Sequence, residues 1–293
     1  MASSDPTSRP PRSQPGASNV APAPAASSAP VHRAERVPRV NVAGVGISAL
    51  SLDSATDAIA RAVATRSKGY ICVTGVHGVI EAQSDPEFRQ ILNRSFLTTP
   101  DGMPTVWMGK LQGARHMTRV YGPDLMLRVC EWSVGAGCSH FLYGGAPGVA
   151  RELRSRLVAR FPGLRVAGLF EPPFRALNPE EEAQLIREVN SVRPDLFWVG
   201  LSTPKQERFM AQYLPRLETT LMLGVGAAFD FHAGRVRQAP RWMQRSGLEW
   251  LFRLGCEPRR LWKRYLRNNP LFLWHATAQL TGLKRYPLDD TRG

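Results

Sequence analysis

An aspartate inside a rigid turn is the first residue of this sequence that could carry out chemistry. Asp101 lies in the segment Thr99–Pro104, where proline and glycine restrict the backbone on both sides of the carboxylate. A carboxylate held on such a loop can act as a general base toward a hydroxyl group. The same composition is typical of an ordinary turn, because Asp and Gly favour turns in any protein. Asp101 is therefore a candidate catalytic base, with a structural turn as the alternative.

Two other segments combine glycine or polar residues with the start of a predicted helix. Gly144 and Gly145 open a turn that ends at Gly148, where a phosphate or a sugar could approach the backbone and the following helix N-terminus. Lys205 and Gln206 stand at the start of another predicted helix, where exposed amide groups attract anions. Glycine turns and polar helix starts are also common without a ligand, so neither segment is specific by itself.

The histidines and cysteines show no spacing that is typical of a metal site. The four cysteines form no C-x-x-C pair and are expected to be reduced, mostly buried thiols. Among the six histidines only His77, which follows a predicted strand ending at Thr74, is placed for a functional site. The sequence therefore predicts no metal and no cofactor.

A dinucleotide-binding fingerprint occurs near the start of the folded part. Gly44–Ala49 fits the pattern G-x-G-x-x-A, but the next helix is expected near Asp53 or Ser54 rather than at the second glycine. The strand ending at Thr74 also lacks the acidic residue that would bind a ribose. An NAD-dependent oxidoreductase is therefore a less favoured alternative, and a turn at a strand end is the preferred interpretation.

Apolar segments alternate with helical patterns along the chain, and this alternation is the scaffold for the candidate residues. The segment 39–48 is expected to be a strand that leads into a loop. Further strands are expected at Tyr70–Thr74, Ser139–Tyr143, Val166–Leu169, Asp195–Gly200 and Thr220–Val225, and helices at Val79–Leu92, Val149–Phe161 and Pro179–Val192. The alternation predicts an α/β, Rossmann-like fold with a largely parallel sheet. Ligands of such sheets bind beyond the carboxyl ends of the strands, where the candidate residues lie.

The composition divides the chain into three regions. Residues 1–40 hold 8 Pro, 7 Ser and 8 Ala and are expected to form a disordered tail. Residues 41–238 form the predicted α/β core, and residues 239–293 form a helical appendage without a strand pattern. The sequence shows no secretory signal and no run of about 20 apolar residues that could span a bilayer. We therefore expect a cytoplasmic protein.

Positive charge is concentrated in the appendage. Lys and Arg number 38 against 24 Asp and Glu, which gives a formal net charge of +14, and residues 235–267 contribute more than half of that excess. Four tryptophans lie in or just beyond this stretch, at Trp242, Trp250, Trp262 and Trp274. Basic helices with aromatic side chains bind to anionic membrane surfaces. Nucleic-acid binding is the rival interpretation, although no nucleic-acid-binding motif is present.

Six blocks in fixed order resemble the WecG/TagA/CpsF glycosyltransferases, also called glycosyltransferase family 26. The blocks are Pro100–Trp107, Arg119–Leu125, Phe141–Gly148, Val199–Glu207, Gly224–Phe231 and Gly247–Arg253 with Glu257–Arg260. The resemblance covers about Asn41 to Leu273. It implies an inverting transfer of a hexose or N-acetylhexosamine-type sugar from a UDP-sugar to a polyprenyl-diphosphate-linked glycan, a step in cell-surface polysaccharide biosynthesis at the inner face of the membrane. Self-association into a homo-oligomer stays open.

The resemblance also implies roles for individual residues. Asp101 corresponds to the catalytic base, with Thr74 beside it, and the nucleotide-sugar pocket and the appendage supply the remaining groups. The pocket positions are Arg119, Gln206 and Asp230, and the appendage arginines are Arg253, Arg260 and Arg264, which can neutralise the leaving diphosphate because the sequence has no D-x-D motif for Mg²⁺. Gly75 stands where many relatives have Asn, and His77 could replace the lost contact. Gln238 also replaces a frequent Arg before Ala239 and Pro240.

Overall fold

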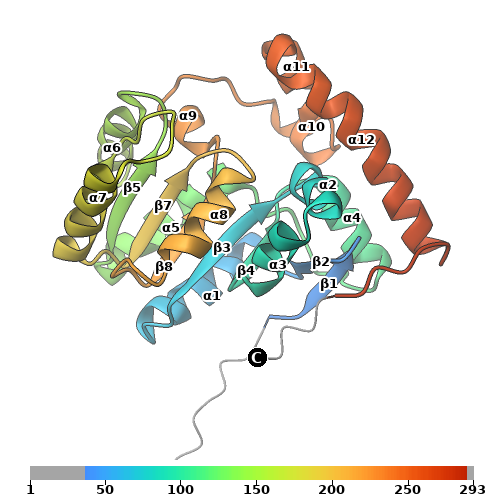
Figure 1. Ribbon diagram of the computed structural model, residues 1–293, viewed down its shortest axis with the longest axis horizontal. Coiled ribbons are helices and arrows are strands. Elements are labelled where there is room, and N and C mark those ends of the chain that lie inside the picture. The colour runs from blue at the N-terminus through green and yellow to red at the C-terminus, as the bar shows by residue number, and fades with distance from the viewer. Residues whose placement is uncertain (1–36, 289–293) are drawn as a thin grey trace, which may run out of the picture. The chain divides into compact units, whose positions relative to one another are not determined.

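A computed structural model describes residues 37–288 of the chain (Figure 1). Most of the predicted tail, residues 1–36, lies outside the described residues, as do residues 289–293. Arg39 and Val40, which the prediction assigned to the tail, belong to the first strand. Residues 37–288 lie in one compact unit that contains both the core and the appendage.

The centre of this unit is a parallel sheet of six strands. The strands are β3 (Gly69–Thr74), β4 (Leu97–Pro100), β5 (Ser139–Gly144), β6 (Arg165–Phe170), β7 (Leu196–Gly200) and β8 (Leu221–Gly224). Their order is β4-β3-β8-β7-β5-β6, and every neighbouring pair runs parallel. The predicted α/β fold with a largely parallel sheet is confirmed. All strands therefore deliver their following loops to the same edge of the sheet.

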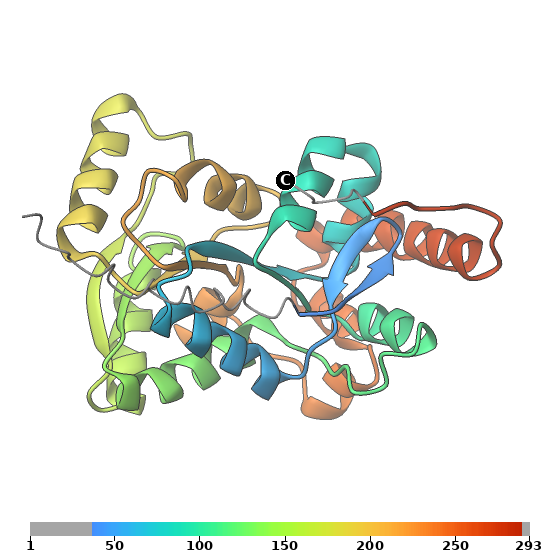
Figure 2. The same cartoon turned by 90° about the horizontal axis from the view of Figure 1, so that it is seen from below.

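Helices cover both faces of the sheet, as the second view shows (Figure 2). The core helices are α1 (Leu52–Ala64), α2 (Val76–Ser84), α3 (Pro86–Arg94), α4 (Met103–Leu111), α5 (Gly122–Ala136), α6 (Val149–Arg160), α7 (Pro179–Val192), α8 (Lys205–Tyr213) and α9 (Ala228–His232). One buried cluster joins α1, α5 and α6 to the sheet through residues such as Ile59 and Leu153. A second cluster joins α2, α3 and α8 through Val79, Phe88 and Met210. Apolar contacts on both faces explain why the central strands are apolar throughout.

The segment 39–48 differs from its prediction. It forms an antiparallel hairpin, with β1 (Arg39–Val42) and β2 (Val45–Ser48) joined by a turn in which Ala43 and Gly44 have positive φ angles of 48° and 84°. Two-residue turns with positive φ suit the twist of paired strands, and glycine adopts them at little cost. No helix follows the glycines directly, so the dinucleotide-binding alternative does not apply, and the preferred interpretation of a turn at a strand end holds. Helix α1 is capped by Ser51, whose hydroxyl accepts from the backbone N–H of Ser54.

The predicted helix Val79–Leu92 is in fact two helices. Asp85 and Pro86 separate α2 from α3, because a residue before proline disfavours helical backbone angles. The Asp85 carboxylate then caps α3 by accepting from the backbone N–H of Phe88 at 2.9 Å. Helix α7, which begins at the predicted Pro179 after the capping residue Asn178, is confirmed at both ends.

The appendage consists of α10 (Arg241–Arg245), α11 (Glu249–Cys256) and α12 (Pro258–Leu280). Helix α12 packs along α2 and buries Leu261 and Phe272 (Figure 1). The last turn of α12 reaches the hairpin, where Gln279 bonds to the backbone of Asn41 and Ala43. Within residues 37–288 no helix combines the length and the apolarity needed to cross a bilayer.

The cysteines lie in two kinds of environment. Cys72, Cys130 and Cys138 are buried in the core, whereas Cys256 is exposed at the end of α11, and all four are free thiols. Burial raises the pKa of the Cys130 thiol to about 12. The prediction of mostly buried, reduced thiols is confirmed.

Candidate active site

A cavity of about 1500 Å³ lies between the carboxyl edge of the sheet and the appendage. Its walls come from loops after the strands and from α11 and α12. The sequence-predicted residues that line it are His77, Asp101, Arg119, Gly145, Lys205, Gln206, Asp230, Arg253, Arg260 and Arg264. The parallel sheet thus brings together residues that are up to 187 positions apart, between His77 and Arg264.

Asp101 is held in place by three backbone contacts. Its N–H donates to the carbonyl of Thr74 at 3.0 Å, which extends the pairing of β4 with β3 by one residue. Its Oδ1 accepts from the N–H of Gly122 at 3.3 Å, and its backbone carbonyl accepts from Nε of Arg119. The other oxygen, Oδ2, lies 3.6 Å from the point where a Cβ of Gly75 would stand. Asp101 therefore presents one oxygen to a fixed N–H and the other toward the loop after β3.

The surroundings of Asp101 keep its carboxyl group basic. Burial raises its pKa to about 6, and the negative charge of Glu249 acts in the same direction. The charges of Arg119 and Arg253 and the Gly122 N–H oppose this rise. A group with a pKa near 6 is mostly ionised at neutral pH and still binds a proton well, which suits a general base.

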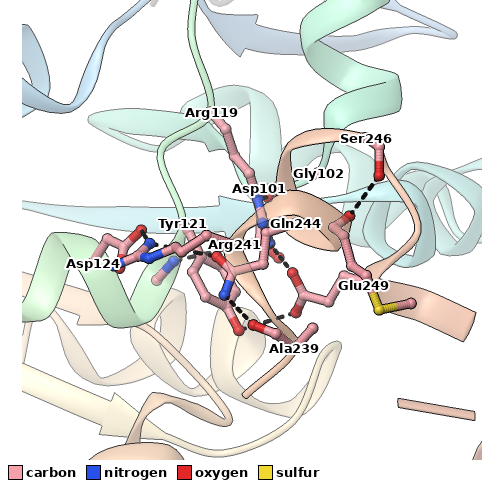
Figure 3. Close-up of polar contacts among 12 residues, drawn as sticks. Asp101, Gly102, Arg119, Tyr121, Asp124, Ala239, Arg241, Gln244, Ser246 and Glu249 are labelled. Atoms are coloured by element: carbon pink, nitrogen blue, oxygen red, sulfur yellow. Dashed lines mark hydrogen bonds and ion pairs between the residues drawn. The ribbon is translucent and has the colours of Figure 1, made fainter. Parts of the chain in front are cut away.

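Glu249, the first residue of α11, links the appendage to Arg119 and Tyr121, which line the cavity (Figure 3). Its Oε2 accepts from Nη2 of Arg119 at 2.5 Å, and its Oε1 accepts from the hydroxyl of Tyr121 at 3.0 Å. The Arg119 guanidinium also lies 3.9 Å from the centre of the Tyr121 ring. Sequence reasoning assigned no role to Glu249 or Tyr121. Their only signal was membership of the family-like blocks Arg119–Leu125 and Gly247–Arg253.

Thr74 lies beside Asp101, and His77 lines the cavity at the start of α2. Thr74 is buried, and it touches Asp101 through its backbone carbonyl, while its Oγ1 has no hydrogen-bond partner among the described residues. The Nδ1 of His77 is 2.8 Å from Nδ2 of Asn268 on α12, and burial lowers the pKa of the ring. His77 thus fastens α12 to the start of α2. Gly75, not His77, faces the Asp101 carboxylate.

The glycine-rich turn after β5 serves close packing. Gly144 has φ 121°, and a Cβ there would lie 2.7 Å from the carbonyl oxygen of Gly200. Gly145 has φ 80° and lies in the cavity wall. The N-terminus of α6, expected to be open to a phosphate, already holds a carboxylate, because Glu171 Oε1 accepts from the N–H of Ala150 at 3.1 Å. A phosphate or a sugar at this turn therefore stays a prediction, and it would have to approach beside the Glu171 carboxylate.

Gln206 lines the cavity and holds a buried hydrogen-bond acceptor without a partner in the described part of the chain. It is 3% exposed, and its Nε2 donates to Oε1 of Glu207 at 3.0 Å and to the carbonyl of Gly224 at 3.4 Å. These two acceptors fix the orientation of the amide, so its Oε1 faces away from them and has no partner among the described residues. Burial raises the pKa of Glu207. Lys205 is exposed at the cavity margin.

Three arginines of the appendage and one aspartate form the opposite wall. Arg253, Arg260 and Arg264 line the same cavity, and burial together with the positive charges of Arg260 and Arg253 lowers the pKa of Arg264. Asp230 on α9 is half-buried, and burial raises its pKa against the opposing charges of Arg260 and Arg253. Nε of Arg253 is buried without a partner in the described part of the chain. Crowded, partly desolvated cations of this kind attract a multiply charged anion such as a diphosphate.

The family model described as the glycosyl transferase WecG/TagA/CpsF family matches residues 40–286. The chain belongs to this family. It is similar to the N-acetylglucosaminyldiphosphoundecaprenol N-acetyl-beta-D-mannosaminyltransferase of Bacillus subtilis (strain 168), with 29% identity over 63% of this chain and 70% of the relative. The protein of the same name from Bacillus spizizenii is 29% identical over 69% of this chain and 76% of the relative.

Membership of the family makes the protein a glycosyltransferase and confirms the resemblance of the six sequence blocks, all of which lie within the matched residues. A glycosyltransferase is therefore preferred over the two alternative functions, an oxidoreductase and a nucleic-acid-binding protein. Within residues 37–288 no three His, Cys, Asp or Glu side chains gather in a group that could hold a metal ion.

Proposed function

We propose that the protein transfers a hexose or N-acetylhexosamine-type sugar, with inversion, from a UDP-sugar to a polyprenyl-diphosphate-linked glycan. One observation carries this proposal. A carboxylate with a pKa of about 6 and a cluster of three arginines line one cavity large enough for a nucleotide sugar and part of an acceptor. The names of the curated relatives, which transfer an N-acetylmannosaminyl group to an undecaprenol-linked sugar, support the choice of transferred sugar and acceptor class.

In the proposed reaction Asp101 acts as the general base. Its carboxylate removes the proton from an acceptor hydroxyl while that oxygen forms a bond to the anomeric carbon of the donor sugar. The bond between that carbon and the diphosphate oxygen breaks, and the nucleoside diphosphate leaves with the electron pair. The proton remains on Asp101 until solvent removes it. One base is sufficient for a single displacement, which inverts the anomeric configuration.

The arginines supply the second half of the catalysis. Negative charge grows on the diphosphate as the bond to the sugar breaks, and fixed cations beside it lower the barrier. Arg253, Arg260 and Arg264 line the same cavity, which supports this role. Gln206 Oε1, which has no partner among the described residues, is suited to accept from an N–H or O–H of the donor.

We further propose that the appendage binds the inner surface of the cell membrane. Its helices expose large apolar side chains, including Trp242, Trp262, Leu266 and Trp274. Basic residues lie exposed among them on α12, at Arg259, Lys263 and Arg267. Side chains of both kinds favour the boundary between lipid headgroups and acyl chains. Binding there would bring the cavity to a membrane-anchored acceptor.

The substitution Asp101→Asn tests the proposed base. It removes the proton acceptor and keeps the size of the side chain, so we expect turnover to fall by about 10²–10⁴-fold. Single-turnover transfer from a radiolabelled UDP-sugar to a lipid-linked acceptor measures the loss. The UDP-sugar should still raise the melting temperature of the variant, because donor binding does not require the base.

Asp57→Asn provides the matched control, since Asp57 is an exposed aspartate on α1, away from the cavity walls. It should transfer at the wild-type rate. Turnover of Asp101→Asn within a few fold of the wild type would exclude Asp101 as the base.

A further inference from the structure

We propose that Glu249 is a positioning residue that keeps Arg119 from pairing with the carboxylate of Asp101. The inference rests on the proposed function, in which Asp101 is the base. The proposal gives Glu249, the first residue of α11, a role beside the catalytic base, although the two residues are 148 positions apart in the sequence.

The contacts of Arg119 show which carboxylate it pairs with. This side chain is only 14% exposed, and it faces two carboxylates, those of Glu249 and Asp101, both of which raise its pKa. Its Nη2 pairs with Glu249, whereas its Nε reaches only the backbone carbonyl of Asp101. The guanidinium therefore touches the backbone of the base residue and leaves the carboxylate to the Gly122 N–H.

The Glu249 carboxylate is itself held by hydrogen bonds, so it can keep the Arg119 guanidinium in this orientation. Both of its carboxylate oxygens are used, one by Arg119 and one by the hydroxyl of Tyr121, and its side chain is 13% exposed. The ring of Tyr121 also lies against the Arg119 guanidinium, so Tyr121 contacts both members of the Arg119–Glu249 pair. Hydrogen bonds between charged groups in partly buried sites are strong and directional.

Loss of the Glu249 charge leaves Arg119 with Asp101 as the nearest anion. A buried guanidinium gains most by turning to a carboxylate, and that ion pair would stabilise the ionised, proton-free form of Asp101. The charged groups that face Asp101 are Arg119 from the loop before α5 and Glu249 and Arg253 from α11. Of these only Glu249 raises the pKa of Asp101. The base therefore weakens when Glu249 is neutralised.

Glu249→Gln is the decisive substitution, because it removes the charge and keeps the length of the side chain. We expect the plateau of kcat/KM to fall by about tenfold or more, and the acidic limb of its pH profile to move to lower pH. A residue with only a structural role would lower the plateau without moving the limb. Melting temperature with and without UDP-sugar establishes that the variant folds and binds donor.

Two further variants sharpen the test. Glu249→Asp keeps the charge but is one methylene too short to hold both partners, so the plateau should fall while the limb stays in place. Tyr121→Phe keeps the Arg119–Glu249 pair and should lower the plateau less than Glu249→Gln, again with the limb unmoved. If Glu249→Gln does not fold, an unchanged plateau in Glu249→Asp overturns the proposal.

A wild-type plateau or an unmoved limb in Glu249→Gln also overturns it. Failure of the proposed function would be seen separately, as wild-type turnover in Asp101→Asn, whatever the behaviour of the Glu249 variants.

Discussion

Burial and the neighbouring arginines shift the pKa of the Asp101 carboxyl group in opposite directions. Burial raises its pKa, Glu249 adds to the rise, and Arg119 and Arg253 oppose it, with a result of about 6. The ionised form needed for catalysis is therefore disfavoured by the fold. Residues that serve a reaction are often held at such a cost in stability.

This cost predicts a pH-dependent gain in stability for Asp101→Asn. A pKa raised from 3.8 to about 6 means that the contribution of Asp101 to stability is fully present below about pH 3.8 and is lost as pH rises through about 6. Replacing the carboxylate by a neutral amide should stabilise the protein at pH 8 by about 1–3 kcal/mol. Thermal unfolding at pH 8 and near pH 4 measures the difference, which should vanish at the lower pH. An equal or lower melting temperature at pH 8 would contradict it.

At the scale of the elements, short edge strand β4 and the start of α5 position the base. The sequence identified Asp101 but not the strand before it, because Leu97–Pro100 contains two threonines and a proline and lacks a run of apolar residues. Proline is tolerated there because β4 is an edge strand. Alternation and apolarity predicted the central strands well, since those are buried on both faces. The edge strand, the hairpin turn at Ala43 and the break at Asp85 depend on local backbone geometry instead.

Two glycines on helix α5 give a matched test of this arrangement. A Cβ at Gly122 would lie 3.1 Å from the carbonyl oxygen of Val225, so Gly122→Ala should push the start of α5 away from Asp101 and weaken its N–H contact. We expect a lower melting temperature and at least about a tenfold loss in kcat/KM, as misplacement of a catalytic group by 1 Å can cost 10²-fold.

The control is Gly135→Ala, near the other end of the same helix. A Cβ there meets no atom within 4 Å, so alanine should leave activity unchanged and raise stability by up to about 1 kcal/mol. Equal effects of the two substitutions would show that the close approach of Gly122 is unimportant.

At the scale of the whole molecule, the appendage completes the cavity and is fastened to the core along its length. Arg241 of α10 bonds to Asp124, and Glu249 of α11 bonds to Arg119. Asn268 and Gln279 of α12 bond to His77 and to the β1–β2 hairpin. The three arginines that the family resemblance named in the appendage line the cavity, and their role toward the diphosphate stays a prediction. The pairing of Glu249 with Arg119 spans 130 residues, and no periodicity or spacing in a single sequence encodes a contact of that range.

The exposed side of the appendage predicts membrane binding through its aromatic residues. Trp262 and Trp274 are 47% and 57% exposed, so replacing both with serine should leave the fold intact. We expect the double variant to bind anionic liposomes at least about tenfold more weakly, because each tryptophan contributes on the order of 1–3 kcal/mol when its apolar surface is buried. Flotation with liposomes measures the binding.

Val158→Ser with Val192→Ser is the control, since both valines are exposed on core helices α6 and α7. Unchanged flotation of the tryptophan variant would remove the appendage as the membrane-binding surface.

The positions of the four cysteines allow the native protein to be labelled at a single site. Three thiols are shielded by the core, and the remaining one, Cys256, lies exposed between α11 and α12. A thiol-reactive fluorophore will therefore attach selectively at this junction in the native protein, without engineered substitutions. Its emission would follow, in real time, the arrival of the appendage at a lipid surface and the filling of the adjoining cavity.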